Sequence, residues 1–263
     1  MLGSCQNEER DEAPMRKNGT PPGRHQPQGL TILYEDRDIL VVDKAAGLLT
    51  IGTRNERTKT AYYRLTDYVR KGYAKSRNRI FIVHRLDRDV SGVLVFAKTP
   101  AAKKALQDRW EEAEKKYLAV VHGRTVDKAG VIATYLAENS AHVVYSTTDP
   151  RKGKLSRTAY RVLKETRAFS LLEIALLTGR KNQIRVHLAE SGHPVVGDRK
   201  YGEEDRAHKR LALHAWLLSF NHPSSGKRMT FEAAVPAHLG RLVGGISREV
   251  PGGSPQSRDE SHR

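Results

Sequence analysis

The feature that most constrains the fold is a succession of short apolar runs of strand length, most of them separated by turns rather than by helices. Helices are expected only near residues 60–69, 99–113 and 182–191. Strands are expected near residues 32–34, 39–42, 115–122, 131–135, 142–146, 156–163, 170–177, 211–220 and 229–232. Consecutive strands joined by tight turns pair antiparallel. The sequence therefore predicts an α+β fold with a mixed, mostly antiparallel sheet and flanking helices and loops.

The composition predicts one folded domain between two polar ends. The chain has 263 residues and is 38% hydrophobic, which is enough for a core, but no apolar run reaches the length of a membrane span. Residues 1–29 and 246–263 are polar and are expected to be disordered tails, which leaves 30–245 as the domain. A single cysteine, Cys5, excludes an internal disulfide and favours a reducing, cytoplasmic compartment. A monomer is the default expectation.

The net charge of +16 lies in the body of the chain, because each tail carries equal numbers of basic and acidic residues. A domain this basic suggests a polyanionic partner, most simply nucleic acid, although a basic surface without a ligand is the alternative. Residues 54–79 hold nine basic and two acidic residues with four tyrosines among them, and 150–167 hold seven basic and one acidic. Both stretches could bind an RNA backbone, and exposed tyrosines could stack on unpaired bases. A solvated helix face with inward tyrosines explains 54–79 equally well.

One polar loop between two apolar runs carries the most reactive group. It reads His84-Arg85-Leu86-Asp87-Arg88-Asp89-Val90-Ser91-Gly92. Because the apolar runs on both sides pack in the core, such a loop can expose a reactive side chain and still hold it in position. The alternative is that the Asp and Arg side chains are simply solvated, or form an ion pair that fixes a turn. Arg85 and Arg88 would keep Asp87 and Asp89 ionised, so an acid/base pair of carboxylates is disfavoured. An ionised aspartate suits a nucleophile better than a general acid.

Other chemistries lack their motifs. The eleven histidines are scattered along the sequence without a His-Glu-x-x-His pattern, so no metal site is expected. Neither a Gly-x-Ser-x-Gly elbow nor a Gly-rich phosphate loop is present. An aspartate in a basic domain, without a cofactor motif, suits chemistry on RNA that needs no energy source. Isomerisation of a nucleoside meets this description, but composition alone does not select it.

Five motifs, in order over residues 30–236, resemble those of RluA-type pseudouridine synthases. Residues 84–92 resemble that family's His-Arg-Leu-Asp-x-x-Thr-Ser-Gly signature. The others are Leu33-Tyr34-Glu35-Asp36 with Ile39–Lys44 and Gly47-Leu48; Lys116-Tyr117-Leu118-Ala119 with Gly123; Thr178-Gly179-Arg180 through Leu188, then Gly192–Asp198 and Tyr201-Gly202; and Leu213-His214-Ala215 with Phe220 and His222-Pro223. Thr158, Tyr160 and Val162 fit the strand before the fourth motif. Residues 1–29 are too short for the small RNA-binding domain that many members carry.

The resemblance implies a pseudouridine synthase catalytic domain that isomerises uridine in RNA without metal or cofactor. Ribosomal RNA, the family's commoner target, is slightly favoured over transfer RNA. The implied catalytic residues are Asp87, Arg185 paired with it, and Tyr117 stacked on the uracil, with Leu86 and Ile184 lining the pocket. The implied RNA contacts are Arg85, Arg88, Arg180, Lys181, Gln183 and His187, together with Arg64 and Arg70 of the basic stretch.

Three positions depart from the family pattern. Val90 replaces the family's Thr, Ala45 replaces its usual Pro, and Asn182 replaces a His that is often found there. These differences put loop detail and substrate preference in doubt, but not the chemistry. The competing hypothesis is a catalytically silent RNA-binding protein, such as a chaperone or assembly factor. Loss of Asp87, Tyr117 or Arg185 would mark such a protein, and all three are present.

Overall fold

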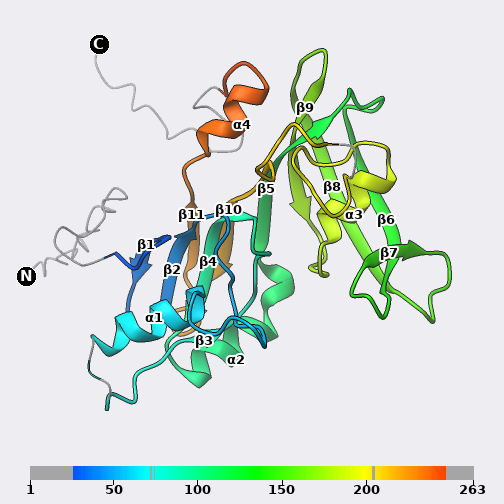
Figure 1. Ribbon diagram of the computed structural model, residues 1–263. Helices are drawn as coiled ribbons and strands as arrows, with labels where there is room; N and C mark the ends of the chain where they lie inside the picture. Colours follow the sequence, from blue (N-terminus) through cyan, green and yellow to red (C-terminus); the bar gives the residue numbers. More distant parts are fainter. Residues whose placement is uncertain (1–25, 72, 74, 203–204, 247–263) are drawn as a thin grey trace, which may run out of the picture.

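The computed structural model describes residues 26–71, 73, 75–202 and 205–246 and places their strands in one sheet (Figure 1). The strands are β1 (Leu30–Glu35), β2 (Ile39–Lys44), β3 (Phe81–Ile82), β4 (Ser91–Ala97), β5 (Glu114–His122), β6 (Ala129–Glu138), β7 (Val144–Thr147), β8 (Lys154–Glu165), β9 (Phe169–Leu176), β10 (Leu213–Asn221) and β11 (Arg228–Glu232). The helices are α1 (Ala61–Arg70), α2 (Pro100–Asp108), α3 (Gln183–Glu190) and α4 (Ala237–Leu242), with the 3₁₀ turn η1 (Trp110–Glu112).

The sheet is mixed and mostly antiparallel, which confirms the predicted α+β class. Its order is β1-β2-β4-β10-β5-β9-β8-β6-β7, with β11 beside β10 and β3 beside β4. Only β4 and β10 pair in parallel among the described strands. None of the helices in the described part of the chain is long and apolar enough to cross a membrane.

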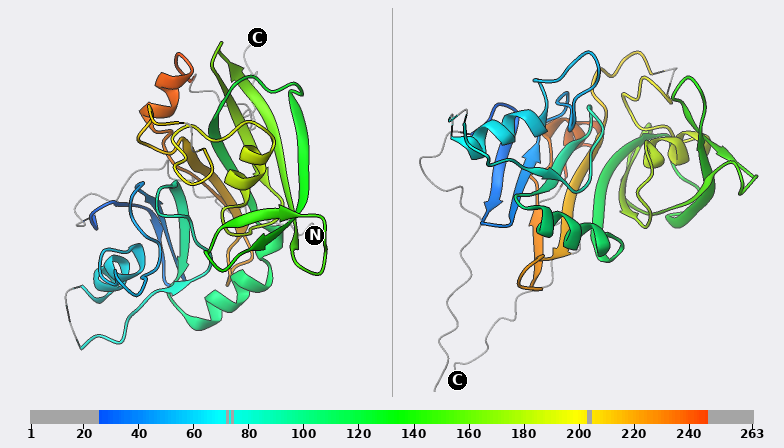
Figure 2. Two further views of the ribbon diagram at one scale, coloured as in Figure 1. Left: turned by 45° about the vertical axis from the view of Figure 1, so that its right-hand side comes forward. Right: turned by 90° about the horizontal axis from the view of Figure 1, so that it is seen from below.

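The strands gather into two lobes on either side of β5 (Figures 1 and 2). One lobe holds β1, β2, β4, β10 and β11 with helices α1 and α2, and the other holds β6 to β9 with α3. The main core joins both lobes, since it contains Leu40 and Phe96 of the first lobe and Leu172 and Leu188 of the second. The arrangement therefore holds loops from both lobes in fixed positions along the line of β5.

Local signals set the ends of α1 as predicted. Thr60 caps the helix by accepting a hydrogen bond from the Tyr63 backbone N–H, and Lys71 ends it in the left-handed conformation. Leu65 and Val69 are the large apolar residues on its buried face.

The helix predicted over residues 99–113 is shorter in the structure. Thr99 and Pro100 begin it as expected, but α2 ends at Asp108 and a 3₁₀ turn follows. Trp110 continues the apolar spacing of the helix, but it lies in the 3₁₀ turn, where its ring packs on that of His84 with centroids 4.5 Å apart. Periodicity therefore could not mark the end of this helix. Helix α4 was not predicted, because six residues give too little periodicity.

The parallel contact between β4 and β10 fixes the end of the 84–92 loop. Gly92 has φ +120°, and a Cβ there would lie 2.1 Å from the carbonyl oxygen of Ala215. Only glycine fits such an approach without displacing backbone. Next to it, the Ser91 hydroxyl and His214 Nδ1 are hydrogen-bonded at 2.9 Å. The loop thus leaves the sheet at a point that both strands determine.

Candidate active site

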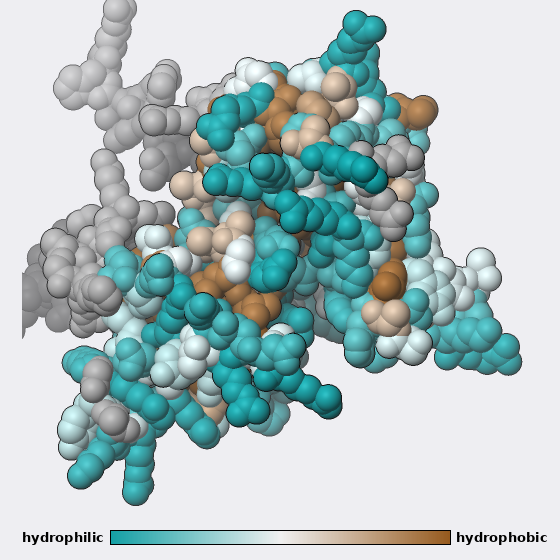
Figure 3. All heavy atoms as spheres, viewed as in Figure 1, coloured by the Kyte–Doolittle hydropathy of each residue, from teal (hydrophilic) through white to brown (hydrophobic). Residues whose placement is uncertain are grey.

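A cleft of about 1350 Å³ runs between the lobes, and a smaller cavity of about 90 Å³ adjoins it. Four residues line both spaces: Arg85, Asp87, Asn182 and Arg185. The view in Figure 3 shows hydrophilic side chains over most of this side of the molecule, with apolar atoms exposed between them. Asp87 therefore lies where a small, partly apolar cavity meets a wide polar cleft, the usual form of a ligand site.

The loop that carries Asp87 is held by the end of β2 and the segment after it. Lys44 is fully buried, and its Nζ donates to the carbonyls of Arg88 (3.1 Å), Leu48 (2.8 Å) and Ala45 (3.0 Å). The Thr50 hydroxyl donates to the Leu86 carbonyl at 2.7 Å and lies 3.2 Å from the Leu86 backbone N–H. These bonds fix the backbone on both sides of Asp87.

The Lys44 ammonium is a buried cation in contact with this loop. Burial lowers the pKa of Lys44 to about 8, although the charges of Asp89, Asp87 and Asp43 act in the opposite direction. Three carbonyl partners satisfy its donors, so the buried charge is hydrogen-bonded throughout.

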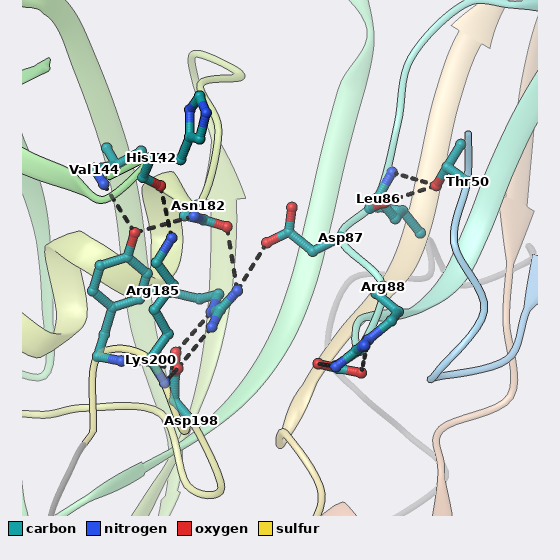
Figure 4. Close-up of polar contacts among 12 residues, drawn as sticks. Thr50, Leu86, Asp87, Arg88, His142, Val144, Asn182, Arg185, Asp198 and Lys200 are labelled. Atoms are coloured by element: carbon teal, nitrogen blue, oxygen red, sulfur yellow. Dashed lines mark hydrogen bonds and ion pairs between the residues drawn. The ribbon is translucent and has the colours of Figure 1, made fainter. Parts of the chain in front are cut away.

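Arg185 projects from α3 toward Asp87 across the boundary between the lobes (Figure 4). Its Nη1 donates to Asp87 Oδ2 at 3.2 Å, which is the pairing that the resemblance implied. Its Nε and Nη2 donate to the two carboxylate oxygens of Asp198, each at 2.7 Å. Burial acts to lower the pKa of Arg185, but the bonds and charges of Asp198 and Asp87 outweigh it and raise that pKa. The guanidinium is therefore charged, and its bidentate pairing with Asp198 fixes its position.

The loop after α3 completes the support of Arg185. Asp198 Oδ1 also accepts the backbone N–H groups of Lys200 (2.9 Å) and Tyr201 (3.1 Å). The guanidinium lies over the Tyr201 ring, 5.2 Å from its centroid, and the Tyr201 hydroxyl accepts from Asn182 Nδ2 at 3.1 Å. Asn182 Oδ1 in turn accepts from Arg185 Nη1 at 3.2 Å. Hydrogen-bond acceptors therefore surround the edge of the guanidinium, and the Tyr201 ring supports its face.

Tyr117 forms part of the small cavity. It lies on β5 between β9 and β10, it is 9% exposed, and it shares the cavity lining with Leu86, Ile184 and Asp87. Burial and the charge of Asp87 raise the pKa of the Tyr117 phenol, so it stays neutral at physiological pH. The structure thus brings together five residues from separate parts of the sequence that the resemblance placed in one site.

Comparison with known proteins identifies the family of the chain. A family model described as RNA pseudouridylate synthase matches residues 38–190, which is more than half of the chain. RNA pseudouridine synthase YlyB of Bacillus subtilis is 36% identical over 222 residues, which cover 83% of this chain and 73% of that protein. The chain belongs to the RNA pseudouridylate synthase family.

Two further relatives extend the comparison. Ribosomal large subunit pseudouridine synthase D of Nitrosomonas europaea is 35% identical over 233 residues, or 84% of this chain. The match covers 66% of that protein, so the chain spans just under two thirds of its length. The solved structure of human RNA pseudouridylate synthase domain containing 1 has a TM-score of 0.65 and 28% identity over 83% of this chain and 89% of that one.

The residues expected to contact RNA divide into two groups within this family fold. Arg85 and Arg180 are exposed beside the small cavity, and Lys181 is exposed at the cleft. Arg88, also at the cleft, pairs with Asp89 at 3.1 Å, not with Asp87. These positions leave the expected RNA contacts possible.

Gln183 and His187 are both buried, and Gln183 also lines the small cavity, so an RNA contact at either residue stays a prediction. Gln183 is 2% exposed, and its amide bonds to Thr158 Oγ1 (2.9 Å) and to the backbone N–H of Arg180 (3.0 Å). His187 is 1% exposed and lies between the hydroxyls of Thr158 (2.9 Å) and Thr134 (3.0 Å). Both side chains fix α3 to the sheet and so position Arg185 indirectly.

Arg64 and Arg70 lie on α1, outside the residues that line the cleft. Arg64 Nη1 donates to the Gln28 carbonyl, and Arg70 Nε donates to the Asn78 carbonyl at 3.2 Å. An RNA contact at either residue therefore stays a prediction, and it would have to share the guanidinium with a backbone partner.

Lys44, Thr50 and Asp198 were not assigned a role from the sequence. Lys44 and Asp198 lay inside the quoted motifs, so the resemblance contained a signal for them. Their function shows only in three dimensions, since Lys44 and Asp198 act on groups 44 and 13 residues away. Of the departures from the family pattern, Val90 is 3% exposed within the core, where an apolar side chain fits.

Proposed function

We propose that this protein isomerises uridine to pseudouridine within structured RNA, with Asp87 as the catalytic carboxylate and no metal or cofactor in the reaction. The observation that carries the proposal is the ion pair of Asp87 with Arg185 at the junction of cavity and cleft. A guanidinium 3.2 Å away favours the ionised carboxylate and orients it. The ionised form suits addition to ribose C1′ or uracil C6, or removal of a proton from the sugar.

The cavity around Tyr117 would receive the uracil. A stacked base is out of reach, so the enzyme must extrude the nucleotide at a cost of a few kcal/mol, which is less in a loop. The Tyr117 ring would stack on the extruded uracil, with Leu86 and Ile184 against its edge. Arg85 is exposed next to Asp87 and would contact a phosphate or fill the space that the base vacates.

Ribosomal RNA is the favoured substrate class. Several similar proteins are named ribosomal large subunit pseudouridine synthase D, which supports this choice over transfer RNA. The excess positive charge of the body would hold the RNA backbone. A cytoplasmic monomer is part of the same proposal and follows from the cysteine usage and the default oligomeric state.

The test replaces Asp87 with Asn and uses Asp89→Asn as the matched control. Asp89 lies two residues away in the same loop and pairs with exposed Arg88, so its loss removes an equal charge without touching Arg185. Pseudouridine mapping of total RNA, with and without the gene, first identifies the substrate uridine. On that RNA, Asp87→Asn should form no product and should bind as wild type does, whereas Asp89→Asn should retain turnover.

The competing function is an RNA-binding protein without catalysis. It would be supported if the map lost no pseudouridine on deletion of the gene. If the map identifies a uridine but Asp87→Asn modifies it at the normal rate, the protein is a synthase whose catalytic residue is not Asp87.

A further inference from the structure

Two histidines and one aspartate, distant in sequence from one another, converge outside the active site. His122 is the last residue of β5, while Asp205 and His208 lie in the segment between α3 and β10. His122 Nε2 lies 2.8 Å from Asp205 Oδ2, and His208 Nδ1 lies 2.8 Å from Asp205 Oδ1. The ligand atoms of all three side chains lie within 4.8 Å of one another. The sequence did not suggest a metal site because His122 is more than eighty residues from the other two.

The donor set matches that of an open transition-metal site. Two imidazoles and one carboxylate, with water in a fourth position, are a known arrangement for Zn²⁺.

The surroundings orient these ligands. The backbone N–H groups of Gly197 (2.7 Å) and His208 (3.1 Å) each donate to one oxygen of Asp205. The ring of Phe169 meets both imidazoles edge to face, with centroids 5.5 Å away in each case. The two histidine side chains keep about a third of their surface exposed, 33% and 31%, so an ion and its water could enter. Outer contacts of this kind fix ring orientation in metal sites.

We propose that His122, Asp205 and His208 bind one Zn²⁺ ion, which clips the segment before β10 to the end of β5. This site is structural and independent of the proposed isomerisation. Its consequence for the active site is indirect, because the Gly197 N–H that bonds Asp205 immediately precedes Asp198, the carboxylate that grips Arg185.

The alternative is a hub of hydrogen bonds in which both imidazoles simply donate N–H groups to Asp205. Substitution by glutamine separates the two. A glutamine amide can donate to the carboxylate, but it is a poor ligand for Zn²⁺. His122→Gln and His208→Gln are therefore the test variants. His142→Gln is the matched control, since His142 is an exposed histidine that also pairs with a carboxylate, Glu138 at 2.9 Å, but lacks a second imidazole.

The experiment titrates ZnCl₂ into chelator-treated full-length protein by calorimetry and repeats the titration with CoCl₂, whose visible absorption reports the ligand geometry. Wild type and His142→Gln should each bind one equivalent of Zn²⁺ tightly, and binding should raise the midpoint of thermal unfolding. With Co²⁺, both proteins should show a d–d absorption band. His122→Gln and His208→Gln should each lower the affinity for this Zn²⁺ ion by more than about 100-fold, which exceeds the effect of losing a residue that only hydrogen-bonds to a metal ligand.

Equal Zn²⁺ binding by wild type and His208→Gln would overturn the proposal, because the ion would then lie elsewhere on the chain. Absence of the tight equivalent in wild type would equally overturn it and leave the hydrogen-bonded hub. Circular dichroism without added metal checks that each variant is folded before its titration is interpreted.

Discussion

Arg185 is oriented by Asp198 more than by Asp87. The two bonds to Asp198 are 2.7 Å each, whereas the bond to Asp87 is 3.2 Å and uses the one remaining nitrogen. The Asp198 side chain has no exposed surface, so it cannot touch RNA. Its effect on the reaction must therefore pass through the position of the guanidinium.

Replacement of Asp198 by Asn should lower kcat by about 10- to 100-fold, since a misplaced reacting group costs about this much. KM should change little, because the Asp198 side chain has no exposed surface, although it lies in the wall of the cleft. Steady-state kinetics on the mapped substrate measures both constants, with Asp89→Asn as the control for charge. A rise in KM at constant kcat would mean that Arg185 serves to bind RNA rather than to orient Asp87.

Single residues of the site differ in how far the sequence predicts their surroundings, for a physical reason. The pairing of Asp87 with Arg185 was implied by resemblance and is present at 3.2 Å. The same resemblance implied Gln183 and His187 as RNA contacts, yet the sheet buries both against threonines. Which face of α3 meets the sheet depends on β6 and β8, whose pairing no local pattern reveals.

At the scale of elements, the end of β2 supports the loop that carries Asp87 at some cost to stability. Burial raises the pKa of Asp43 to about 6 from 3.8, despite the neighbouring charge of Lys44 and the backbone N–H of Gly92. Between those two values the folded state binds a proton that the unfolded state has released. The contribution of Asp43 to the free energy of unfolding therefore falls as pH rises from about 4 to 6.

Replacement of Asp43 by Asn should thus stabilise the protein relative to wild type at pH 7, by up to about 3 kcal/mol, and leave it nearly unchanged at pH 4. Urea unfolding at a series of pH values gives the difference. The control, Asp108→Asn, removes an exposed aspartate of α2 and should show no such trend. A difference that does not depend on pH would mean that Asp43 is ionised equally in both states.

At the scale of the molecule, the sequence predicted the class but not the assembly. Most strands lay where the apolar runs placed them, because alternation is a local property. The parallel contact that joins Ser91 to His214 spans more than a hundred residues, so no local pattern could predict it. The lobes are joined through β5, which pairs with β10 of one lobe and with β9 of the other, and the cleft lies between them.

The cleft receives cations from both lobes, and this arrangement predicts how RNA affinity depends on salt. Arg85 lies on one wall, and Arg199, in the loop after α3, lies on the other; both are exposed. If each neutralises one phosphate, Arg85→Ala and Arg199→Ala should each reduce the slope of log K against log salt by about 0.7 to 0.9. The double variant should lose the sum, since residues on separate walls share no partner.

Filter binding of the mapped RNA over a range of salt concentrations measures these slopes. The control is Lys104→Ala on α2, an exposed lysine that does not line the cleft. A slope unchanged in Arg199→Ala but reduced in Arg85→Ala would mean that RNA lies along one lobe only. Equal loss in Lys104→Ala would mean that the overall charge, rather than the cleft, holds the RNA.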